Sequence, residues 1–255
     1  MENLNGKCVL VTGASKGIGA EIARQMGAAG AHVVAHYGSD RAGAEAAVAD
    51  VDEARKRLVS ADFSDLAAVE ALWDAAQAWR GKVDVLVNNA ATMLWEGGVE
   101  EDIPRWDEVW ETSMRVNVLA PARLLRRAVR DYLDGDGGTI VTISSWTAQK
   151  GVGNPENIAY GSSKAAIHNA TLSIARAYAD RGILAYVIAP GVVRTRLSDQ
   201  AAEAMGGEEQ VTANLAMKEW VPPSDIARTT VFLASGLARH LTGATLDING
   251  ASYVR

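Results

Sequence analysis

The chain has 255 residues, 48% of them hydrophobic, and a formal net charge of −6. This length suits a single α/β domain, and the hydrophobic content allows a large core. The acidic balance argues against a nucleic-acid-binding surface and does not favour binding to anionic membranes.

The N-terminus lacks the basic start and long apolar stretch of a secretory signal. No apolar run approaches the ~18 residues needed to span a bilayer. Cys8 is the only cysteine, so no intrachain disulfide is possible. We therefore expect a reducing, cytoplasmic location and a buried Cys8, which lies within an apolar strand pattern.

Short apolar runs alternate with longer segments of helical period. Most runs are apolar throughout, as in strands that are covered on both faces. The predicted strands are Cys8–Thr12, His32–His36, Arg57–Ser60, Val83–Asn88, Thr139–Ser144, Leu184–Ala189 and Thr245–Ile248. The predicted helices are Gly17–Ala29, Arg41–Val51, Leu66–Trp79, Pro104–Leu133, Ile158–Asp180 and Ser224–Ala234.

Asp65 and Ser224 are the expected N-caps of their helices, and Gly30 and Gly182 lie where helices should end. The alternation predicts one α/β domain over residues 1–255, a doubly wound parallel (Rossmann-like) sheet of about seven strands with helices on both faces. Such sheets bind ligands beyond the carboxyl ends of their strands.

A glycine-rich segment, Thr12-Gly13-Ala14-Ser15-Lys16-Gly17-Ile18-Gly19, follows the first strand. Glycines there permit a tight turn and let backbone N–H groups approach a pyrophosphate, while the next helix adds positive potential. Three residues rather than one separate the first two glycines, which departs from the commonest dinucleotide fingerprint.

Further motifs follow this segment in a fixed order. With the Thr-Gly-x-x-x-Gly-x-Gly spacing, they resemble the short-chain dehydrogenase/reductase family along essentially the whole chain. They are Asn88-Asn89-Ala90-Ala91 after the fourth strand, Asn117 in the next helix, Ser144-Ser145 at the end of the fifth strand, Tyr160-Gly-Ser-Ser-Lys164 opening a helix, and Pro190-Gly191-Val-Val-Arg-Thr195 after the sixth strand.

Tyr160 and Lys164 are four residues apart on a predicted helix, so their side chains share one face. A free tyrosine has a pKa of about 10 and is a poor base at neutral pH. A nearby ammonium stabilises the phenolate, and we therefore expect Lys164 to lower the pKa of Tyr160.

The resemblance implies a role for each of four residues. Tyr160 would protonate a carbonyl oxygen or deprotonate an alcohol. Ser145 would hydrogen-bond the substrate oxygen, Lys164 would hold the ribose hydroxyls, and Asn117 would hold a water chain that resupplies Lys164 with protons. The implied activity is NAD(P)(H)-dependent hydride transfer with a small-molecule carbonyl or secondary alcohol.

Cofactor contacts are implied in the same way. Asp62 would meet the adenine amino group, Asn89 and Ala90 would lie under the adenine ribose, and Thr195 would meet the carboxamide. The predicted cofactor residues are Thr12, Gly13, Ser15, Lys16, Gly17, Ile18, Gly19, Tyr37, Ser39, Asp62, Phe63, Asn89, Ala90, Ala91, Lys164, Pro190, Gly191, Val193 and Thr195.

Three features depart from the family pattern. Ala91 stands at a usual glycine, and Asn249-Gly250-Ala251 replaces a pair of glycines. The loop Trp146–Ala159 is about two residues longer than the family norm. Thr147 is therefore an alternative to Ser145 as the residue that binds the substrate oxygen. We prefer Ser145, because it lies at the end of the predicted strand and Thr147 lies beyond it.

The predicted substrate pocket contains Trp95, Trp146, Thr147 and Val192, with Met93 and Leu94 nearby. A lid is expected around residues 194–220, carrying Met205, Leu215, Met217 and Trp220. Apolar and aromatic walls suit a hydrophobic carbonyl compound. The alternative is that these residues pack the lid against the body or a neighbouring subunit.

Cofactor choice depends on the end of the second strand, where NAD-binding proteins commonly present an acid. This chain has Tyr37, Gly38 and Ser39 there, and Lys16 could pair with a 2′-phosphate. Asp40 could swing back and repel that phosphate. We expect NADP(H) to be preferred, with NAD(H) possible.

Several charged residues and a histidine are not expected to form a binding or catalytic site. Arg123, Arg126, Arg127 and Arg130 are expected on a solvated helix face, and His168 at the surface or an interface. No metal-binding motif is present. Two alternative functions stay open: a 3-oxoacyl-(acyl-carrier-protein) reductase, and a cofactor-binding regulatory protein without turnover.

The helices Pro104–Leu133 and Ile158–Asp180 are the longest predicted. A helix that packs only on a sheet needs one apolar stripe, and the second helix has more. Its small and apolar residues are Ala165, Ala166, Ile167, Ala170, Leu172, Ile174, Ala175 and Ala177. In relatives these helices form a dimer interface, and we expect a homotetramer.

Overall fold

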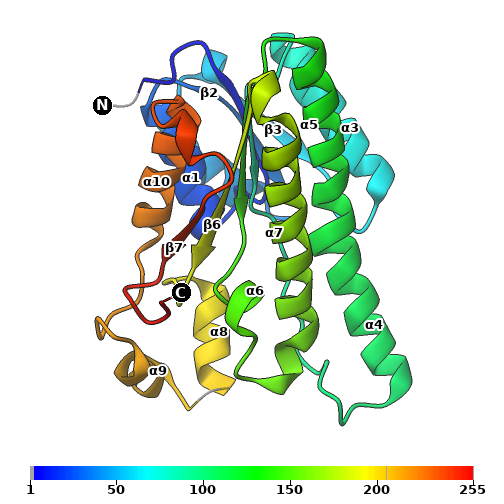
Figure 1. The fold of residues 1–255 in the computed structure, drawn as a ribbon, viewed down its shortest axis with the longest axis vertical. Helices are drawn as coiled ribbons and strands as arrows, with labels where there is room; N and C mark the ends of the chain where they lie inside the picture. Colours follow the sequence, from blue (N-terminus) through cyan, green and yellow to red (C-terminus); the bar gives the residue numbers. More distant parts are fainter. Residues whose placement is uncertain (1–2, 205, 255) are drawn as a thin grey trace.

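A seven-stranded parallel sheet in the order β3-β2-β1-β4-β5-β6-β7 forms the centre of the protein, which confirms the predicted doubly wound fold. The computed structural model describes residues 3–204 and 206–254 (Figure 1). The strands are β1 Cys8–Val11, β2 His32–Tyr37, β3 Lys56–Ser60, β4 Val85–Asn88, β5 Gly138–Ile143, β6 Ile183–Pro190 and β7 Thr245–Ile248.

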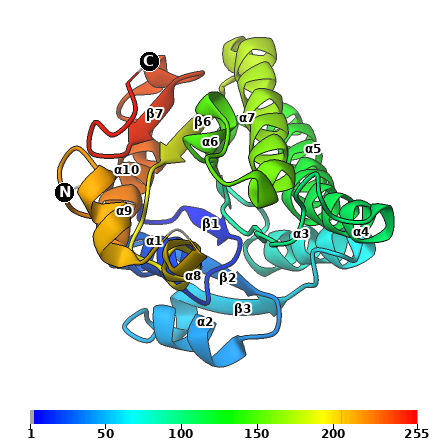
Figure 2. The same ribbon diagram turned by 90° about the horizontal axis from the view of Figure 1, so that it is seen from below.

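Helices cover both faces of this sheet (Figures 1 and 2). The side chains of α1 and α10 pack on one face, and those of α3, α5 and α7 pack on the other. The longer helices are α1 Gly17–Ala28, α3 Leu66–Arg80, α4 Ile103–Met114, α5 Ala120–Asp134, α7 Ile158–Tyr178 and α10 Pro223–Ser235. The shorter ones are α2 Arg41–Ala47, α6 Thr147–Lys150, α8 Arg196–Ala204 and α9 Glu208–Asn214.

The central strands are buried on both faces, which explains their uninterrupted apolar sequences. Val9 and Val11 of β1 contribute to the core under α1 and α10, whereas Leu10 faces the core under α3 and α5. Register pairs Leu10 with Val34 of β2 and with Leu86 of β4. All strands therefore end on the same side of the molecule, and their following loops converge there.

The predicted helix Pro104–Leu133 is interrupted by a π-turn, η2 Arg115–Leu119, between α4 and α5. A single widened turn changes which side chains face inward, and such turns are frequent at functional sites. Asn117 lies in this turn and is buried, with 2% of its surface exposed. Helical periodicity alone does not reveal the extra residue.

One predicted N-cap is present and the other is wrong. The Asp65 carboxylate accepts a hydrogen bond from the Ala67 N–H at 2.8 Å and caps α3. Helix α10 instead has Pro222 as its N-cap, and Ser224 lies inside its first turn. Proline suits that first turn because the turn leaves N–H groups without partners in any case. Gly182 adopts a left-handed conformation with φ 73° where the chain leaves α7, as expected.

Cys8 is buried, as predicted, and burial raises the pKa of its thiol to about 12. His168 is not at the surface: it is buried, and its Nε2 lies 2.9 Å from Thr245 Oγ1 of β7. Arg127 is not simply solvated either, because its guanidinium binds Glu70 and Asp74 of α3 at 3.0 and 2.5 Å. Across residues 3–204 and 206–254, no helix is long and apolar enough to cross a membrane.

The two N-cap candidates give a direct test of the fold. Asp65→Ala should lower the free energy of unfolding by about 1 kcal/mol, because an N–H of α3 loses its partner. Ser224→Ala should change it by less than ~0.5 kcal/mol, since a surface substitution away from a cap has little effect. Urea denaturation of both variants measures the difference; equal losses would show that Asp65 does not cap α3.

Candidate active site

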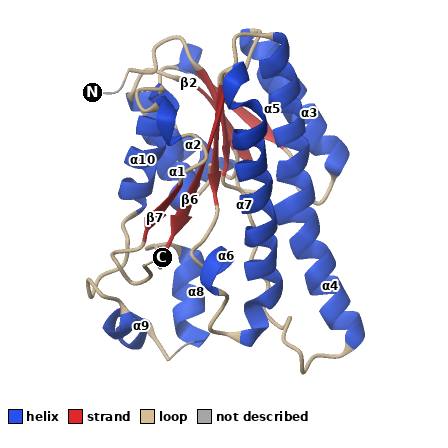
Figure 3. Cartoon of the chain, in the orientation of Figure 1, coloured by secondary structure: helices blue, strands red, loops and turns tan. Residues whose placement is uncertain are grey.

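A cavity of about 630 Å³ lies at the carboxyl ends of β1 to β5. In Figure 3 the arrowheads of β6 and β7 point toward this end of the molecule, which also carries α6 and α8. The predicted residues that line the cavity are Gly13, Lys16, Gly17, Ile18, Gly19, Asp62, Phe63, Asn89, Ala90, Ala91, Met93, Tyr160, Lys164 and Thr195. The structure thus brings residues from the loops after β1, β3, β4 and β6 and from α7 to one place.

The glycine-rich loop forms the tight turn expected of it. Gly13 has φ 67°, a left-handed conformation that disfavours other residues. A Cβ on Gly19 would overlap the Gly13 carbonyl oxygen and the Asn89 amide. The N-cap of α1, Lys16, makes no side-chain cap hydrogen bond, so the first N–H groups of α1 have no side-chain acceptor from their cap. This arrangement fits a pyrophosphate at the start of α1.

Thr12 and Asn89 tie this loop to the loop after β4. The Thr12 hydroxyl donates to the Val87 carbonyl at 3.1 Å and accepts from the N–H groups of Asn89 and Ala90 at 2.9 and 3.0 Å. The Asn89 amide donates to the Thr12 carbonyl at 2.8 Å. These two side chains therefore fix the floor of the cavity, and Thr12 itself is buried.

Tyr160 and Lys164 of α7 both line the cavity, with the Lys164 Nζ 5.8 Å from the centroid of the Tyr160 ring. Lys164 is buried, and its ammonium donates to the Ile143 carbonyl of β5 at 2.9 Å. Burial lowers the pKa of Lys164 to about 8. Burial also raises the pKa of Tyr160 to about 12, although a hydrogen bond with Ser145 acts the other way.

In the protein by itself the pKa of Tyr160 therefore lies above its ordinary value, because burial outweighs the groups around the phenol. Transferring a phenolate from water to the protein interior is unfavourable in free energy, and the neighbouring groups stabilise it by less. Lys164 uses a hydrogen bond on the backbone of β5 rather than on the phenol. An additional positive charge in the cavity is what would favour the phenolate.

Ser145 is buried directly after β5, beyond Ile143 and Ser144. Its hydroxyl accepts hydrogen bonds from the Thr147 N–H at 3.2 Å and from the Thr147 hydroxyl at 2.9 Å. Thr147 begins α6, so this alternative residue supports Ser145 from outside the strand. Ser145 also interacts with the Tyr160 phenol and lowers its pKa.

Asn117 is held by hydrogen bonds on both ends of its amide. Its Oδ1 accepts from the Thr92 N–H at 2.8 Å, and its Nδ2 donates to the Thr92 carbonyl at 2.8 Å and to the Ser163 hydroxyl at 3.0 Å. Ser163 directly precedes Lys164. Asn117 thus joins the loop after β4 to α7, next to the pair Tyr160 and Lys164.

The loop after β2 is arranged around Asp40. The Asp40 carboxylate accepts from the Gly43 N–H at 2.9 Å and caps α2. The Ser15 hydroxyl donates to the Asp40 carbonyl at 2.7 Å, which joins the glycine-rich loop to α2.

Asp62 lies in the loop after β3. Its carboxylate accepts from the Ser64 N–H at 2.8 Å, and hydrogen bonds with Ser64 lower the pKa of the Asp62 carboxyl.

Not every predicted residue lines the cavity. Among the described residues, those outside its wall are Thr12, Ser15, Tyr37, Ser39, Trp95, Asn117, Ser145, Trp146, Thr147, Pro190, Gly191, Val192 and Val193. Trp146 and Val192 pack instead against Ala202, Val211, Leu215 and Trp220, between α8 and the body. This packing is the alternative that the sequence left open for them. Met205 lies outside the described residues.

Polar residues of the wall that the sequence did not name individually include His36 in β2, and Arg196 and Gln200 in α8, within the predicted lid segment 194–220. The last two are four residues apart on one helical face, directly after Thr195, and that spacing was a usable signal. His36 was part of an apolar strand pattern, and only its polarity distinguished it.

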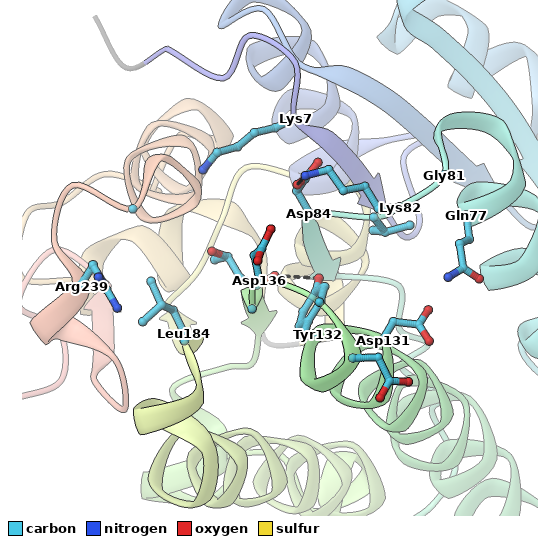
Figure 4. A pocket seen from close by; sticks show the side chains of 18 residues that line it. Lys7, Gln77, Gly81, Lys82, Asp84, Asp131, Tyr132, Asp136, Leu184 and Arg239 are labelled. Carbon is cyan, nitrogen blue, oxygen red and sulfur yellow. Dashed lines mark hydrogen bonds and ion pairs between the residues drawn. The ribbon is translucent and has the colours of Figure 1, made fainter.

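A second cavity, of about 510 Å³, lies at the opposite, amino-terminal end of the sheet (Figure 4). Three of its polar side chains bind the backbone of neighbouring elements. Lys7 donates to the Ala234 carbonyl at the end of α10, Asp84 accepts from the Cys8 N–H, and Tyr132 donates to the Thr139 carbonyl. These bonds connect β1, β4, β5, α5 and α10 at this end of the sheet.

A parallel doubly wound sheet with a glycine-rich turn after β1 defines a dinucleotide-binding protein. A family model described as enoyl-(acyl carrier protein) reductase matches residues 13–251. Together with the relatives below, this match shows that the chain belongs to the short-chain dehydrogenase/reductase family, whose members are oxidoreductases that use NAD(P) cofactors.

The relatives match nearly end to end. The chain is 37% identical to 3beta-hydroxysteroid dehydrogenase 1 of Eggerthella lenta, over 98% of this chain and 94% of that protein. It is 33% identical to the 3-oxoacyl-(acyl-carrier-protein) reductase FabG of Escherichia coli, over 99% of each. A crystal structure of a dehydrogenase/reductase from Sinorhizobium meliloti 1021 superposes with a TM-score of 0.86 at 33% identity, over 99% of this chain and 97% of that one.

The glycine-rich turn can be tested by adding one methyl group. Gly19→Ala should weaken binding of either dinucleotide by at least ~100-fold, because the Cβ would force the Gly13 carbonyl out of the turn. Gly153→Ala is the matched control, since a Cβ there meets nothing within 4 Å. Fluorescence titration with NADPH and NADH measures both; unchanged affinity in the Gly19 variant would contradict this account of the loop.

Proposed function

We propose that this protein transfers a hydride between a nicotinamide dinucleotide and a carbonyl or secondary alcohol, with Tyr160 as the acid/base. The observation that carries the proposal is the shared cavity, in which Tyr160 and Lys164 of α7 face the glycine-rich loop. The chemistry of each group supports it: a phenol can exchange one proton with a substrate oxygen, and an ammonium can stabilise the phenolate.

Each residue of the site has its own role in the proposed reaction. Tyr160 donates a proton to the carbonyl oxygen in reduction, or accepts it from the alcohol in oxidation. Ser145, beside the phenol, hydrogen-bonds the same oxygen and stabilises developing negative charge. Lys164 holds the ribose hydroxyls, and Asn117 holds the turn through which water reaches Lys164.

The cavity fits a dinucleotide. The start of α1 would hold the pyrophosphate, Asp62 the adenine amino group, Asn89 and Ala90 the adenine ribose, and Thr195 the carboxamide. The nicotinamide supplies or accepts the hydride and, when oxidised, brings a positive charge. Such a charge beside Tyr160 would lower the pKa of the phenol, in the direction opposite to burial.

Tyr160→Phe tests the central role. Turnover should fall by at least ~100-fold, because the ring remains but the transferable proton is lost. Cofactor affinity should stay nearly unchanged, since the phenol does not hold the dinucleotide. The assay follows cofactor absorbance at saturating cofactor with the best substrate from a panel of ketones, quinones and secondary alcohols. Near-normal turnover in the folded variant would exclude Tyr160 as the acid/base.

Cofactor preference follows from the groups around the adenine ribose. The Asp40 carboxylate caps α2 by accepting from the Gly43 N–H, and this bond holds it at the start of that helix. Lys16 lines the cavity, and Arg41 lies exposed at the start of α2, where its guanidinium pairs with the exposed Glu45 at 2.8 Å and also interacts with Tyr37. These cations favour NADP(H) over NAD(H).

Lys16→Ala should raise the KM for NADPH about tenfold, the loss expected for one charge-assisted hydrogen bond. The KM for NADH, which lacks the 2′-phosphate, should change by less than ~twofold and serves as the internal control. A wild-type kcat/KM that favours NADH, or an equal effect of the substitution on both cofactors, would contradict the preference.

Two substrate classes compete for this site. The relative from Eggerthella lenta is named for a 3beta-hydroxysteroid, and the relative from Escherichia coli for an acyl-carrier-bound substrate. The net charge of −6 does not favour docking of an acidic carrier. We therefore propose a hydrophobic small-molecule substrate, enclosed by the lid at residues 194–220. Turnover of a carrier-bound thioester far above that of alicyclic ketones would favour the second class.

We also propose a homotetramer. Ile103 of α4 and Leu119 of the π-turn are 69% and 47% exposed on the helix rod that runs beside α7, and Ala166 is exposed on α7. Exposed apolar groups on these helices suit a helix-to-helix interface between copies. Light scattering at micromolar concentration should give four times the chain mass of 27.0 kDa. A fully active monomer would contradict the assembly.

A further inference from the structure

His36 occupies an unusual position within β2. Only 2% of its surface is exposed, and its ring lies between the loops that follow β1 and β3. Nδ1 is 3.0 Å from the Gly13 nitrogen, and Nε2 is 3.0 Å from the Ala61 carbonyl oxygen. The ring also stacks on Phe63, with centroids 4.6 Å apart and planes 19° from parallel.

These partners define the protonation state of the imidazole. A backbone N–H can only donate, so Nδ1 carries no proton; a backbone carbonyl can only accept, so Nε2 carries one. Burial lowers the pKa of His36 to about 4, so the ring is neutral at physiological pH. One neutral tautomer thus bridges two main-chain groups that have no other connection through a side chain.

His36 also binds two of the backbone N–H groups of the glycine-rich loop. Its ring accepts a hydrogen bond from the Gly13 N–H, and its backbone carbonyl accepts one from the Ala14 N–H at 2.8 Å. The N–H groups of Gly13 and Ala14 therefore hold the fold. The N–H groups at the start of α1, from Gly17 onward, receive no side-chain hydrogen bond from the N-cap and suit a phosphate.

We propose that His36 is a positioning residue for the dinucleotide: its imidazole fixes the distance between the phosphate-binding loop and the segment Ala61–Phe63 that receives the adenosine. This inference rests on the proposed function. His36 lines the same cavity as Gly13, Asp62 and Phe63, and it contacts or neighbours each of them. No substrate atom needs to reach it, so its effect should be on cofactor binding and not on the chemical step.

Three substitutions separate its contacts. His36→Phe keeps a ring on Phe63 but removes both hydrogen bonds. His36→Asn can return an acceptor near Nδ1 for the Gly13 N–H, and His36→Gln can return a donor near Nε2 for the Ala61 carbonyl. His32→Phe is the control, because it makes the same change at the other end of the same strand, where His32 packs edge-on against Trp79.

Each variant is titrated with NADPH and NADH, and kcat is measured at saturating cofactor. His36→Phe should raise the Kd of both dinucleotides at least ~tenfold and change kcat by less than ~threefold. His36→Asn should recover most of the affinity, and His32→Phe should match the wild type. Should His36→Phe fail to fold, the Asn and Gln variants still compare the two bonds.

The outcomes are distinguishable. A wild-type protein that binds neither dinucleotide overturns the proposed function and this inference with it. A wild type that binds while His36→Phe binds equally well overturns only the role of His36. Loss of kcat or of thermal stability at unchanged Kd, or an Asn variant no better than Phe, would show that His36 supports the fold without positioning the cofactor.

Discussion

The site depends on one constraint: polar side chains buried at the carboxyl edge of the sheet must be satisfied by the backbone of the neighbouring strands. The Thr12 hydroxyl binds the main chain of β4 and its loop, the His36 ring binds the loops after β1 and β3, and the Lys164 ammonium binds the end of β5. Each bond joins a side chain on one element to the backbone of another: the loop after β1 to β4, β2 to the loops beside it, and α7 to β5. The loops that form the cavity are therefore positioned by the sheet itself.

The same burial decides the electrostatics of the acid/base pair. It raises the pKa of Tyr160 and lowers that of Lys164, so the protein by itself disfavours charge on both groups. The neutral phenol is a competent acid for a carbonyl, but a poor base for an alcohol. A positively charged nicotinamide would shift this balance toward the phenolate. In this account, proton transfer in the oxidative direction is coupled to the presence of the oxidised cofactor.

The amino-acid sequence predicted the strands, the sheet type and many of the residues that line the cavity at its carboxyl edge, because apolar runs and ordered motifs are local signals. It misplaced features set by tertiary contacts. Ser224 resembles a cap, but proline begins α10. The π-turn at Asn117 adds a residue without changing the apolar pattern. Trp146 packs against the buried cluster that contains Leu215 and Trp220. The His36 ring binds Gly13 and Ala61, which are distant from it in sequence. The pKa of Tyr160 depends on burial, which spacing on a helix cannot show.

The central claim is that hydride leaves or enters the nicotinamide of a dinucleotide in this cavity while Tyr160 exchanges only a proton. Reduction of an accepted ketone with NADPH that carries deuterium at the transferable C4 position tests it directly. The account predicts one cofactor-derived deuterium on the product carbon in each turnover, and none on that carbon from deuterated solvent. Solvent-derived deuterium on the carbon, or product formed without oxidation of the cofactor, would contradict it.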